Sequence, residues 1–328
     1  MTLTAVILRI ERISLNDGRG MRTVVFFKGC PLRCAWCSTP ESQNGRPEVY
    51  YRQERCRLCG ACVAACPEQA LRQAEDGSRL LRDPARCRGC FRCVEVCNYR
   101  AHLIYGRKMT VEQVMREIRK DEIFFFHSGG GVTLSGGDLL CQTDFAEALL
   151  RECIDSGIDT CAELDLYAVP SLVRRIVPLL DSCYADLKCL DAAVHKQWTG
   201  ADNDLILANL RLTDRLCRPG RLTVRVPVVA GINDGADNIR RTAEFCDSLH
   251  NCGELEFLPY HRLGLHAYRQ LQRPYLLEDR PPLNRWDVYQ RMGFLCDQPH
   301  HYAISISGLP VYEPASGKLP VTKEELQA

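Results

Sequence analysis

The residues with the clearest chemical potential are three closely spaced cysteines. Cys30, Cys34 and Cys37 form a C-x3-C-x2-C pattern just after a β-branched run that ends at Phe27. Three thiolates can hold three irons of a cubane 4Fe–4S cluster, because each iron takes one ligand from outside the cube. The fourth iron would then be open to a substrate. Structural zinc is the alternative, but zinc usually takes four ligands at regular paired spacing, and the sequence offers no obvious fourth ligand nearby.

Eight further cysteines form an internal repeat in which both copies read C-x2-C-x2-C-x3-C. The first copy is Cys56, Cys59, Cys62 and Cys66, and the second is Cys87, Cys90, Cys93 and Cys97. This is the spacing of bacterial two-cluster ferredoxins, in which the fourth cysteine of each run ligates the other cluster. We therefore expect one 4Fe–4S cluster on Cys56, Cys59, Cys62 and Cys97, and another on Cys66, Cys87, Cys90 and Cys93. Paired zinc sites are the alternative, which the duplicated spacing disfavours.

The overall cysteine content indicates a reducing compartment. The chain has 20 cysteines in 328 residues, nine of them outside these clusters. In a cytosolic protein such abundance is typical of metal binding or redox chemistry, whereas disulfides belong to exported chains. The first ten residues lack the features of a secretory signal, so we expect a cytoplasmic protein. Scattered cysteines such as Cys153, Cys183 and Cys246 are expected to be small core residues.

Charge and hydropathy exclude two classes of partner. The formal net charge is +1, from 42 Lys and Arg against 41 Asp and Glu. No basic excess therefore indicates binding to nucleic acid or to an anionic membrane surface. No apolar run approaches the roughly 18 residues that a membrane span requires. We expect neither nucleic acid nor a membrane as partner.

Outside the repeat, short β-branched runs alternate with amphipathic helical patterns. The predicted strands cover 23–27, 132–135, 159–163, 183–187, 222–226 and 254–258, and the predicted helices cover 110–120, 143–156, 171–180 and 238–248. Thr110 and Gln113 have the form of a capping box at the start of the first helix. Alternating strands and helices predict parallel βα units with right-handed crossovers.

Six strands are too few for a closed eight-stranded barrel. The predicted fold is therefore α/β, a partial (β/α)6 barrel formed by residues 1–47 and 104–328. Residues 48–103 are predicted to be inserted after the first strand as an α+β ferredoxin-like domain. In parallel sheets, ligands gather at the carboxyl ends of the strands, so residues just after each strand are the candidates for chemistry.

Several motifs, in a characteristic order, carry a family resemblance that runs almost from end to end. They are Asp17-Gly18-Arg19-Gly20-Met21-Arg22, Lys28-Gly29-Cys30-Pro31-Leu32-Arg33-Cys34, Pro40-Glu41-Ser42, Thr199-Gly200 with Asn203 and Ile206-Leu207-Ala208-Asn209, Arg225-Val226-Pro227 with Gly231-Ile232-Asn233-Asp234, and Leu258-Pro259-Tyr260-His261. Together with the C-x3-C-x2-C pattern, they resemble the radical S-adenosylmethionine superfamily and, more narrowly, the glycyl-radical enzyme activating enzymes.

The resemblance implies a site for S-adenosylmethionine at the open iron. Gly136-Gly137-Asp138 resembles the family's G-G-E, and Glu163 and Asp186 end two strands where the family places carboxylates. The residues that the resemblance assigns to the cofactor are Trp36, Gly136, Gly137, Asp138, Glu163, Asp186, Lys188, Arg225 and His261. Some members also bind a monovalent cation there. The alternatives are a plain glycine turn, solvated surface carboxylates and a structural histidine, whereas a guanidinium among Val and Leu requires a carboxylate partner.

Some positions depart from the family pattern, and they cluster near the cofactor. Arg19 replaces a proline, Thr39 replaces an asparagine, and Asp138-Leu139 replaces Glu-Pro. The run Glu163-Leu164-Asp165-Leu166 replaces an acid-Thr-x-Gly run, which removes a hydroxyl that could help to bind a cation.

These features predict an activating enzyme with three 4Fe–4S clusters. It would cleave S-adenosylmethionine reductively to a 5′-deoxyadenosyl radical, which would take a Cα hydrogen from a glycine of a partner glycyl-radical enzyme. Reduced ferredoxin or flavodoxin is the expected electron donor, through the two inserted clusters. One alternative is a radical enzyme that acts on a small molecule or a peptide. Another is an electron-transfer protein that no longer cleaves the cofactor, against which the intact Cys30, Cys34 and Cys37 speak.

Overall fold

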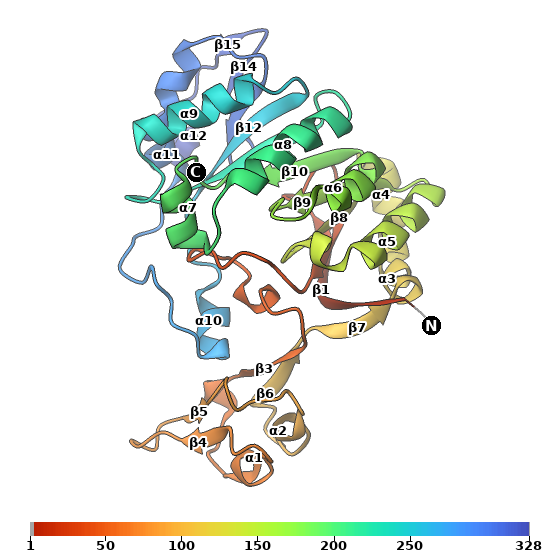
Figure 1. Ribbon diagram of the computed structural model, residues 1–328, viewed down its shortest axis with the longest axis vertical. Coiled ribbons are helices and arrows are strands. Elements are labelled where there is room, and N and C mark those ends of the chain that lie inside the picture. Colours follow the sequence, from red (N-terminus) through yellow and green to blue (C-terminus); the bar gives the residue numbers. More distant parts are fainter. Residues whose placement is uncertain (1–2, 328) are drawn as a thin grey trace.

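The computed structural model describes residues 3–327 and confirms the α/β fold with one large sheet (Figure 1). The strand order is β15-β14-β13-β12-β11-β10-β9-β8-β2-β1-β7. The strands from β2 to β13 in this order are parallel to their neighbours. Strands β1 and β7 add antiparallel at one edge, and β14 and β15 add antiparallel at the other. The sheet is therefore open, as a partial barrel requires. Residues 1, 2 and 328 of the predicted barrel segments lie outside the described residues.

All six predicted strands are present in the parallel part of the sheet. The sheet strands are β1 (Thr4–Ser14), β2 (Arg22–Phe27), β7 (Arg107–Thr110), β8 (Gly131–Gly136), β9 (Asp159–Leu164), β10 (Ser182–Asp186), β11 (Leu222–Val228), β12 (Cys252–Pro259), β13 (Ala303–Ile306), β14 (Leu309–Glu313) and β15 (Gly317–Lys318). The sequence prediction missed β13, the seventh parallel strand, and the four antiparallel strands. Strand β1 carries Arg9, Glu11 and Arg12, and β13 has four residues, so neither produces a long β-branched run.

Apart from the helix at Leu265–Leu271, the helices of the main domain share a continuous core with the sheet. Their bounds are α3 (Val111–Ile118), α4 (Glu122–Ser128), α5 (Thr143–Asp155), α6 (Pro170–Ile176), α7 (Ala192–Thr199), α8 (Asp204–Leu216), α9 (Ala236–Asp247), α10 (Leu265–Leu271), α11 (Arg285–Met292) and α12 (Lys323–Gln327). Short 3-10 helices cover Pro40–Ser42, Gln53–Arg55, Arg119–Asp121, Leu139–Gln142, Val177–Leu179 and Gly293–Asp297. The four predicted helices correspond to α3, α5, α6 and α9.

The capping box of α3 is formed as predicted. The Thr110 hydroxyl accepts a hydrogen bond from the backbone N–H of Gln113 at 3.2 Å, and the Gln113 side chain accepts one from the Thr110 N–H at 2.9 Å. These reciprocal bonds satisfy two N–H groups that the first turn of a helix leaves free. Cys153, Cys183 and Cys246 are buried in the main core, in agreement with their predicted role.

The cysteine repeat folds into a small module below the sheet in Figure 1. Strand β3 (Glu48–Tyr51) pairs antiparallel with β6 (His102–Tyr105), and β4 (Leu71–Gln73) pairs antiparallel with β5 (Leu80–Arg82). The short helices α1 (Ala61–Ala64) and α2 (Arg92–Glu95) each lie within one run of cysteines and carry its third cysteine, Cys62 or Cys93. The module has its own small core, formed by Tyr51, Cys62, Leu71, Leu80 and Ala101.

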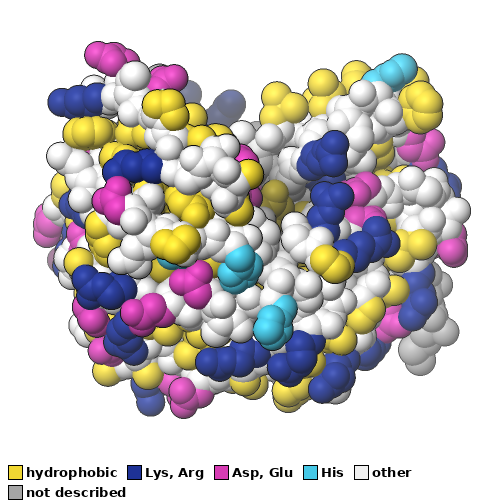
Figure 2. Space-filling view, turned by 90° about the horizontal axis from the view of Figure 1, so that it is seen from above, with side chains coloured by type: hydrophobic (Ala, Val, Ile, Leu, Met, Phe, Trp, Pro, Cys, Tyr) yellow, Lys and Arg dark blue, Asp and Glu magenta, His cyan; other side chains and the backbone are white. Residues whose placement is uncertain are grey.

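The described surface matches the balanced charge of the sequence. On the face seen in Figure 2, basic and acidic side chains are interspersed with hydrophobic ones. None of the helices in residues 3–327 is both long and apolar enough to cross a membrane.

Candidate active site

The carboxyl ends of the parallel strands border one large pocket, with about 1820 Å³ of empty space including its open mouth. This is where ligands bind in open α/β sheets. Its lining includes Cys30, Cys34, Trp36, Cys37, Gly136, Gly137, Glu163, Asp186, Lys188 and His261. The structure therefore brings together most of the residues that the sequence assigned to the site. Asp138 and Arg225 are not part of the lining.

The loop that carries Cys30, Cys34 and Cys37 is held through its backbone by a distant motif. The N–H of Arg33 donates to the carbonyl of Thr199 at 2.7 Å, and the N–H of Ala35 donates to the carbonyl of Trp198 at 2.9 Å. The Thr-Gly segment at the end of α7 thus fixes the middle of the cysteine loop.

Three thiols are the number of ligands that a cubane cluster with one free corner requires. Those of Cys30, Cys34 and Cys37 border the same pocket and leave its mouth open. Burial raises the pKa of the Cys34 thiol to about 12, and the ammonium of Lys188 acts against that rise. Lys188 is itself buried and pairs with Asp186. Burial alone would lower the pKa of Lys188, but Asp186 and Cys34 raise it, so Lys188 is a cation. A cation near Cys34 favours the thiolate, which is the form of cysteine that binds iron.

Gly136, the last residue of β8, and Gly137 bring this strand end close to the cysteine loop. Gly136 has φ +111°, and a Cβ there would collide with the backbone of Phe27. A Cβ on Gly137 would collide with the carbonyl of Gly29, and the N–H of Asp138 donates to that carbonyl at 2.7 Å. The glycines are therefore more than a plain turn, because they let two backbone segments touch at the pocket wall.

Two acidic residues, Asp138 and Asp165, lie at this wall in different settings. Both carboxylate oxygens of buried Asp138 accept backbone hydrogen bonds, from Leu140 at 2.6 Å and from Asp165 at 3.0 Å. Burial raises the pKa of Asp138, and Asp165 adds to the rise. Asp165 lines the pocket, where its Oδ2 lies 3.2 Å from the Sγ of Cys30. The sequence prediction did not select Asp165, although its place just after β9 was a signal.

Arg225 has the carboxylate partners that its apolar strand requires. Its guanidinium lies 2.5 Å from Glu163 and 2.7 Å from Glu256, and it stacks 3.6 Å above the ring of Tyr184. The second oxygen of Glu163 accepts a hydrogen bond from Ser135. Arg225 thus orients Glu163, which lines the pocket, from outside the lining.

His261 lies at the mouth of the pocket, with its Nδ1 3.3 Å from the N–H of Leu263. His261 is exposed, and partial desolvation of its ring lowers its pKa. Trp36 is buried between Cys34 and Cys37 and contributes the apolar part of the same wall.

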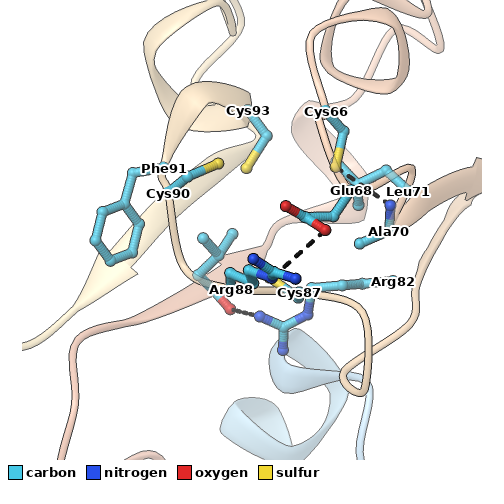
Figure 3. Close-up of a pocket in the computed structure, with 11 residues that line it drawn as sticks. Cys66, Glu68, Ala70, Leu71, Arg82, Cys87, Arg88, Cys90, Phe91 and Cys93 are labelled. Carbon is cyan, nitrogen blue, oxygen red and sulfur yellow. Dashed lines mark hydrogen bonds and ion pairs between the residues drawn. The ribbon is translucent and has the colours of Figure 1, made fainter.

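The eight thiols of the insert are grouped crosswise around two cavities. Cys66, Cys87, Cys90 and Cys93 line one cavity (Figure 3), with about 380 Å³ of empty space including open solvent. Cys56, Cys59, Cys62 and Cys97 line the other, with about 310 Å³ on the same measure. This is the grouping that the ferredoxin spacing predicts. Within residues 3–327, no three His, Cys, Asp or Glu side chains gather closely enough to ligate one metal ion. Each set of four thiols borders a space of its own, and four thiols are the number of ligands that a 4Fe–4S cluster takes.

Comparison with known proteins agrees with this geometry. Residues 48–98 match the family model of the 4Fe–4S dicluster domain. An indoleacetate decarboxylase activating enzyme from Tractidigestivibacter scatoligenes is 38% identical over 308 residues, which cover 90% of this chain and 97% of that protein. The chain belongs to the glycyl-radical enzyme activating enzymes. An isethionate sulfite-lyase activating enzyme from Oleidesulfovibrio alaskensis is 40% identical over 274 residues, 82% of this activating enzyme and 88% of that one.

A solved structure shows the same fold. The peptide-bound form of SuiB from Streptococcus suis matches this activating enzyme with a TM-score of 0.52 and 12% identity, over 87% of this chain and 48% of that one. This activating enzyme is a radical S-adenosylmethionine enzyme, as the cysteine motif and the relatives indicate.

Three buried asparagines join the loops at the pocket of the activating enzyme. The side-chain amide of Asn209 donates to Leu166 and Ala168 after β9, that of Asn203 to Cys189 and Leu190 after β10, and that of Asn233 to Lys188 and Pro227. The motif segments around them carried the family resemblance, but sequence analysis assigned no role to the individual side chains. Their role is to hold the strand-end loops in register with one another.

Helix α10 connects the cysteine loop of the activating enzyme to the insert. At one end, Gly264 packs against the carbonyls of Cys37 and Ser38, and the Tyr268 hydroxyl donates to the Cys34 carbonyl at 3.5 Å. At the other end, Gln272 accepts a hydrogen bond from the Arg82 N–H at 2.8 Å and donates to Leu80 at 2.6 Å. The radical site and the iron–sulfur module are therefore packed on one helix.

Proposed function

We propose that Cys30, Cys34 and Cys37 hold the radical 4Fe–4S cluster, and that S-adenosylmethionine binds its open iron in the strand-end pocket. The observation that carries this proposal is the convergence of the three motif thiols on one pocket with Lys188 and Asp165. When bound, the reduced cluster supplies the electron that splits the cofactor into methionine and a 5′-deoxyadenosyl radical. The relatives indicate a glycyl-radical enzyme as partner, and its glycine segment would enter through the open mouth.

The residues of this chain bind and orient the cofactor in the proposal. Asp165 is the candidate partner for the ammonium group of the methionine moiety, because Asp138 already accepts two backbone hydrogen bonds. Glu163, held by Arg225 and Ser135, provides a second fixed acid on the same wall. Trp36 and the backbone around Gly136, Gly137 and His261 complete the enclosure that keeps water from the reacting centre.

We also propose that residues 48–103 form the separate ferredoxin-like unit that passes electrons from reduced ferredoxin or flavodoxin to the radical site. The support is α10, which contacts both the insert and the cysteine loop. Cys59 and Cys90 lie in different thiol sets, so Cys59→Ala and Cys90→Ala should each slow turnover with a protein donor. Unchanged turnover with reduced flavodoxin in both variants would contradict this route. Within residues 3–327 none of the twenty cysteines forms a disulfide, which supports a cytoplasmic location.

A monovalent cation beside Glu163 and Asp186 would have to share these carboxylates with Arg225 and Lys188. We therefore propose that any such cation binds weakly. Replacing K⁺ by tetramethylammonium should leave cofactor cleavage nearly unchanged, and a strict K⁺ requirement would show that the two pairs open in the loaded enzyme.

The test of the main proposal is anaerobic. The clusters are reconstituted, the protein is reduced with dithionite, S-adenosylmethionine is added, and 5′-deoxyadenosine is quantified. We expect product from the wild type and none from Cys34→Ala, whose insert clusters should still assemble. No product from a fully iron-loaded wild type would refute the proposal. A glycyl-radical signal after mixing with the partner would complete the assignment.

A further inference from the structure

The two cavities of the insert are related position by position through the cysteine repeat. The backbone N–H of Ala70 donates to the Sγ of Cys66, and that of Ala101 donates to the Sγ of Cys97, both at 3.2 Å. In each copy, Ala is the fourth residue after the last cysteine and is preceded by a residue with positive φ. The duplicated backbone therefore presents the same N–H donor to each thiol set.

One wall position breaks this equivalence. The residue after each alanine lines the cavity in both copies, but it is Leu71 in one and His102 in the other. His102 is 2% exposed, and within residues 3–327 neither of its ring nitrogens has a hydrogen-bond partner. Its ring lies 5.2 Å from that of Tyr51, its cross-strand neighbour, which limits how the imidazole can turn. Buried polar atoms without a partner are rare, because each one loses its bonds to water.

We propose that His102 donates an N–H hydrogen bond to a sulfur of the 4Fe–4S cluster held by Cys56, Cys59, Cys62 and Cys97. The inference rests on the proposed crosswise ligation. An imidazole carries at least one N–H in every protonation state, so the donor is always present. Hydrogen bonds to cluster sulfurs stabilise the reduced cluster and raise its reduction potential. His102 thus makes this cluster easier to reduce than it would be with the leucine of the other copy.

Other wall residues also differ between the cavities, so the prediction concerns the effect of this one position. The cavity in Figure 3 is lined by Arg82, Arg88 and Glu68, where the other has Arg57 and Tyr99. Substitution at the two matched positions isolates the histidine from these charges. His102→Leu reproduces the wall of the other copy, and Leu71→His is the reciprocal change. His102→Phe keeps an aromatic ring against Tyr51 and removes only the N–H.

The experiment is a redox titration followed by electron paramagnetic resonance, on the full chain with Cys34→Ala, so that only the two insert clusters titrate. We expect His102→Leu to lower the midpoint potential of one cluster and leave the other unchanged. Leu71→His should raise the midpoint of the other cluster. Should His102→Leu fail to assemble its cluster, His102→Phe makes the same test, because a lowered midpoint is again required.

The outcomes separate this inference from the proposed function. Two assembled clusters whose midpoints do not move in His102→Leu or His102→Phe would overturn the role of His102 and leave the ligation intact. Absence of iron from the insert of the unsubstituted chain after reconstitution would overturn the ligation itself.

Discussion

The carboxylate of Asp138 accepts a hydrogen bond from the backbone N–H of Asp165 at 3.0 Å. This bond ties the end of β8 to the end of β9 and leaves the two acids with different surroundings. Asp138 is 1% exposed and has backbone donors on both oxygens, whereas Asp165 faces the pocket through the oxygen near Cys30. Substitution of Asp165 should therefore affect cofactor binding, whereas substitution of Asp138 should affect stability.

Asp165→Asn should weaken binding of S-adenosylmethionine, because it removes the negative charge proposed to meet the ammonium group. A hydrogen bond to a charged group contributes about 1.5–3 kcal/mol, which corresponds to roughly a 10- to 100-fold loss of affinity. Equilibrium dialysis with labelled cofactor against the reconstituted protein measures it. Asp155→Asn, an exposed position on α5, is the control and should bind like the wild type. Unchanged affinity in a cluster-loaded Asp165→Asn would remove this residue from the site.

Asp138→Ala should lower stability, because two buried N–H groups, those of Leu140 and Asp165, lose their acceptor. Each such loss costs about 1–3 kcal/mol. Asp138→Asn keeps one acceptor oxygen and should lose about half as much. Urea denaturation under anaerobic conditions gives the free energy of unfolding. Equal stability of Asp138→Ala and the wild type would show that these hydrogen bonds do not hold the strand ends together.

Removal of Arg225 should lower the stability of the fold more than removal of one of its two carboxylate partners. Arg225→Met leaves Glu163 and Glu256 without their shared cation in a largely buried site, which costs about 3–5 kcal/mol. Adding Glu256→Gln to Arg225→Met removes one of the stranded charges and should recover part of that loss. A double-mutant cycle of unfolding free energies measures the coupling, expected at about 0.5–3 kcal/mol for contacting residues. Strict additivity would mean that the pair contributes no interaction of its own.

The sequence predicted six of the seven parallel strands, because each of the six is a short run rich in apolar and β-branched residues. It could not predict which side chains at the carboxyl ends of these strands face the pocket. Asp138 instead caps the 3-10 helix at Leu139–Gln142. This depends on the backbone turn after Gly137, which the sequence pattern does not reveal. Glu256 was missed as the partner of Arg225 because the two are paired only by the register of β11 on β12. The antiparallel edges were missed because their strands are short or carry charges.

Burial of His195 makes stability depend on pH. His195 is 1% exposed, its Nδ1 lies 2.6 Å from the carbonyl of Ala201, and burial lowers its pKa. In the unfolded chain His195 has a pKa near 6.5. Below that pH the unfolded chain therefore binds a proton at His195 that the folded chain does not bind. Its contribution is present above about pH 6.5 and is lost as the pH falls toward the lower folded pKa, by at most about 1.4 kcal/mol per pH unit.

His195→Gln should therefore reduce the fall in unfolding free energy between pH 7.5 and pH 5.5, as measured by urea denaturation at several pH values. His127→Gln on α4 is the control, because His127 is exposed and should leave the pH profile as it is. The same acid slope in His195→Gln and the wild type would place the pH dependence elsewhere.

The contact of Gly264 with the cysteine loop should decide whether the radical cluster assembles. Gly264 precedes α10 with φ −72°, so alanine strains no backbone there, but its Cβ would collide with the carbonyl of Cys37 and lie 3.0 Å from that of Ser38. Gly235 precedes α9 with φ −68°, and its Cβ would meet nothing within 4 Å. Both glycines stand at the start of a helix, Gly264 with ψ −15° and Gly235 with ψ 140°. Alanine adopts either conformation without strain, so the collision at Gly264 is the difference that the two Gly→Ala variants test.

We expect Gly264→Ala to lose the iron of the radical cluster and the production of 5′-deoxyadenosine, while the insert keeps its clusters. Gly235→Ala should keep both. Iron analysis together with the cleavage assay measures the two effects, and electron paramagnetic resonance of the insert clusters shows whether the chain has remained folded. If Gly264→Ala matched Gly235→Ala in both readouts, α10 would be free to move away from the loop. The packing of Gly264 against Cys37 would then not be what positions the third thiol.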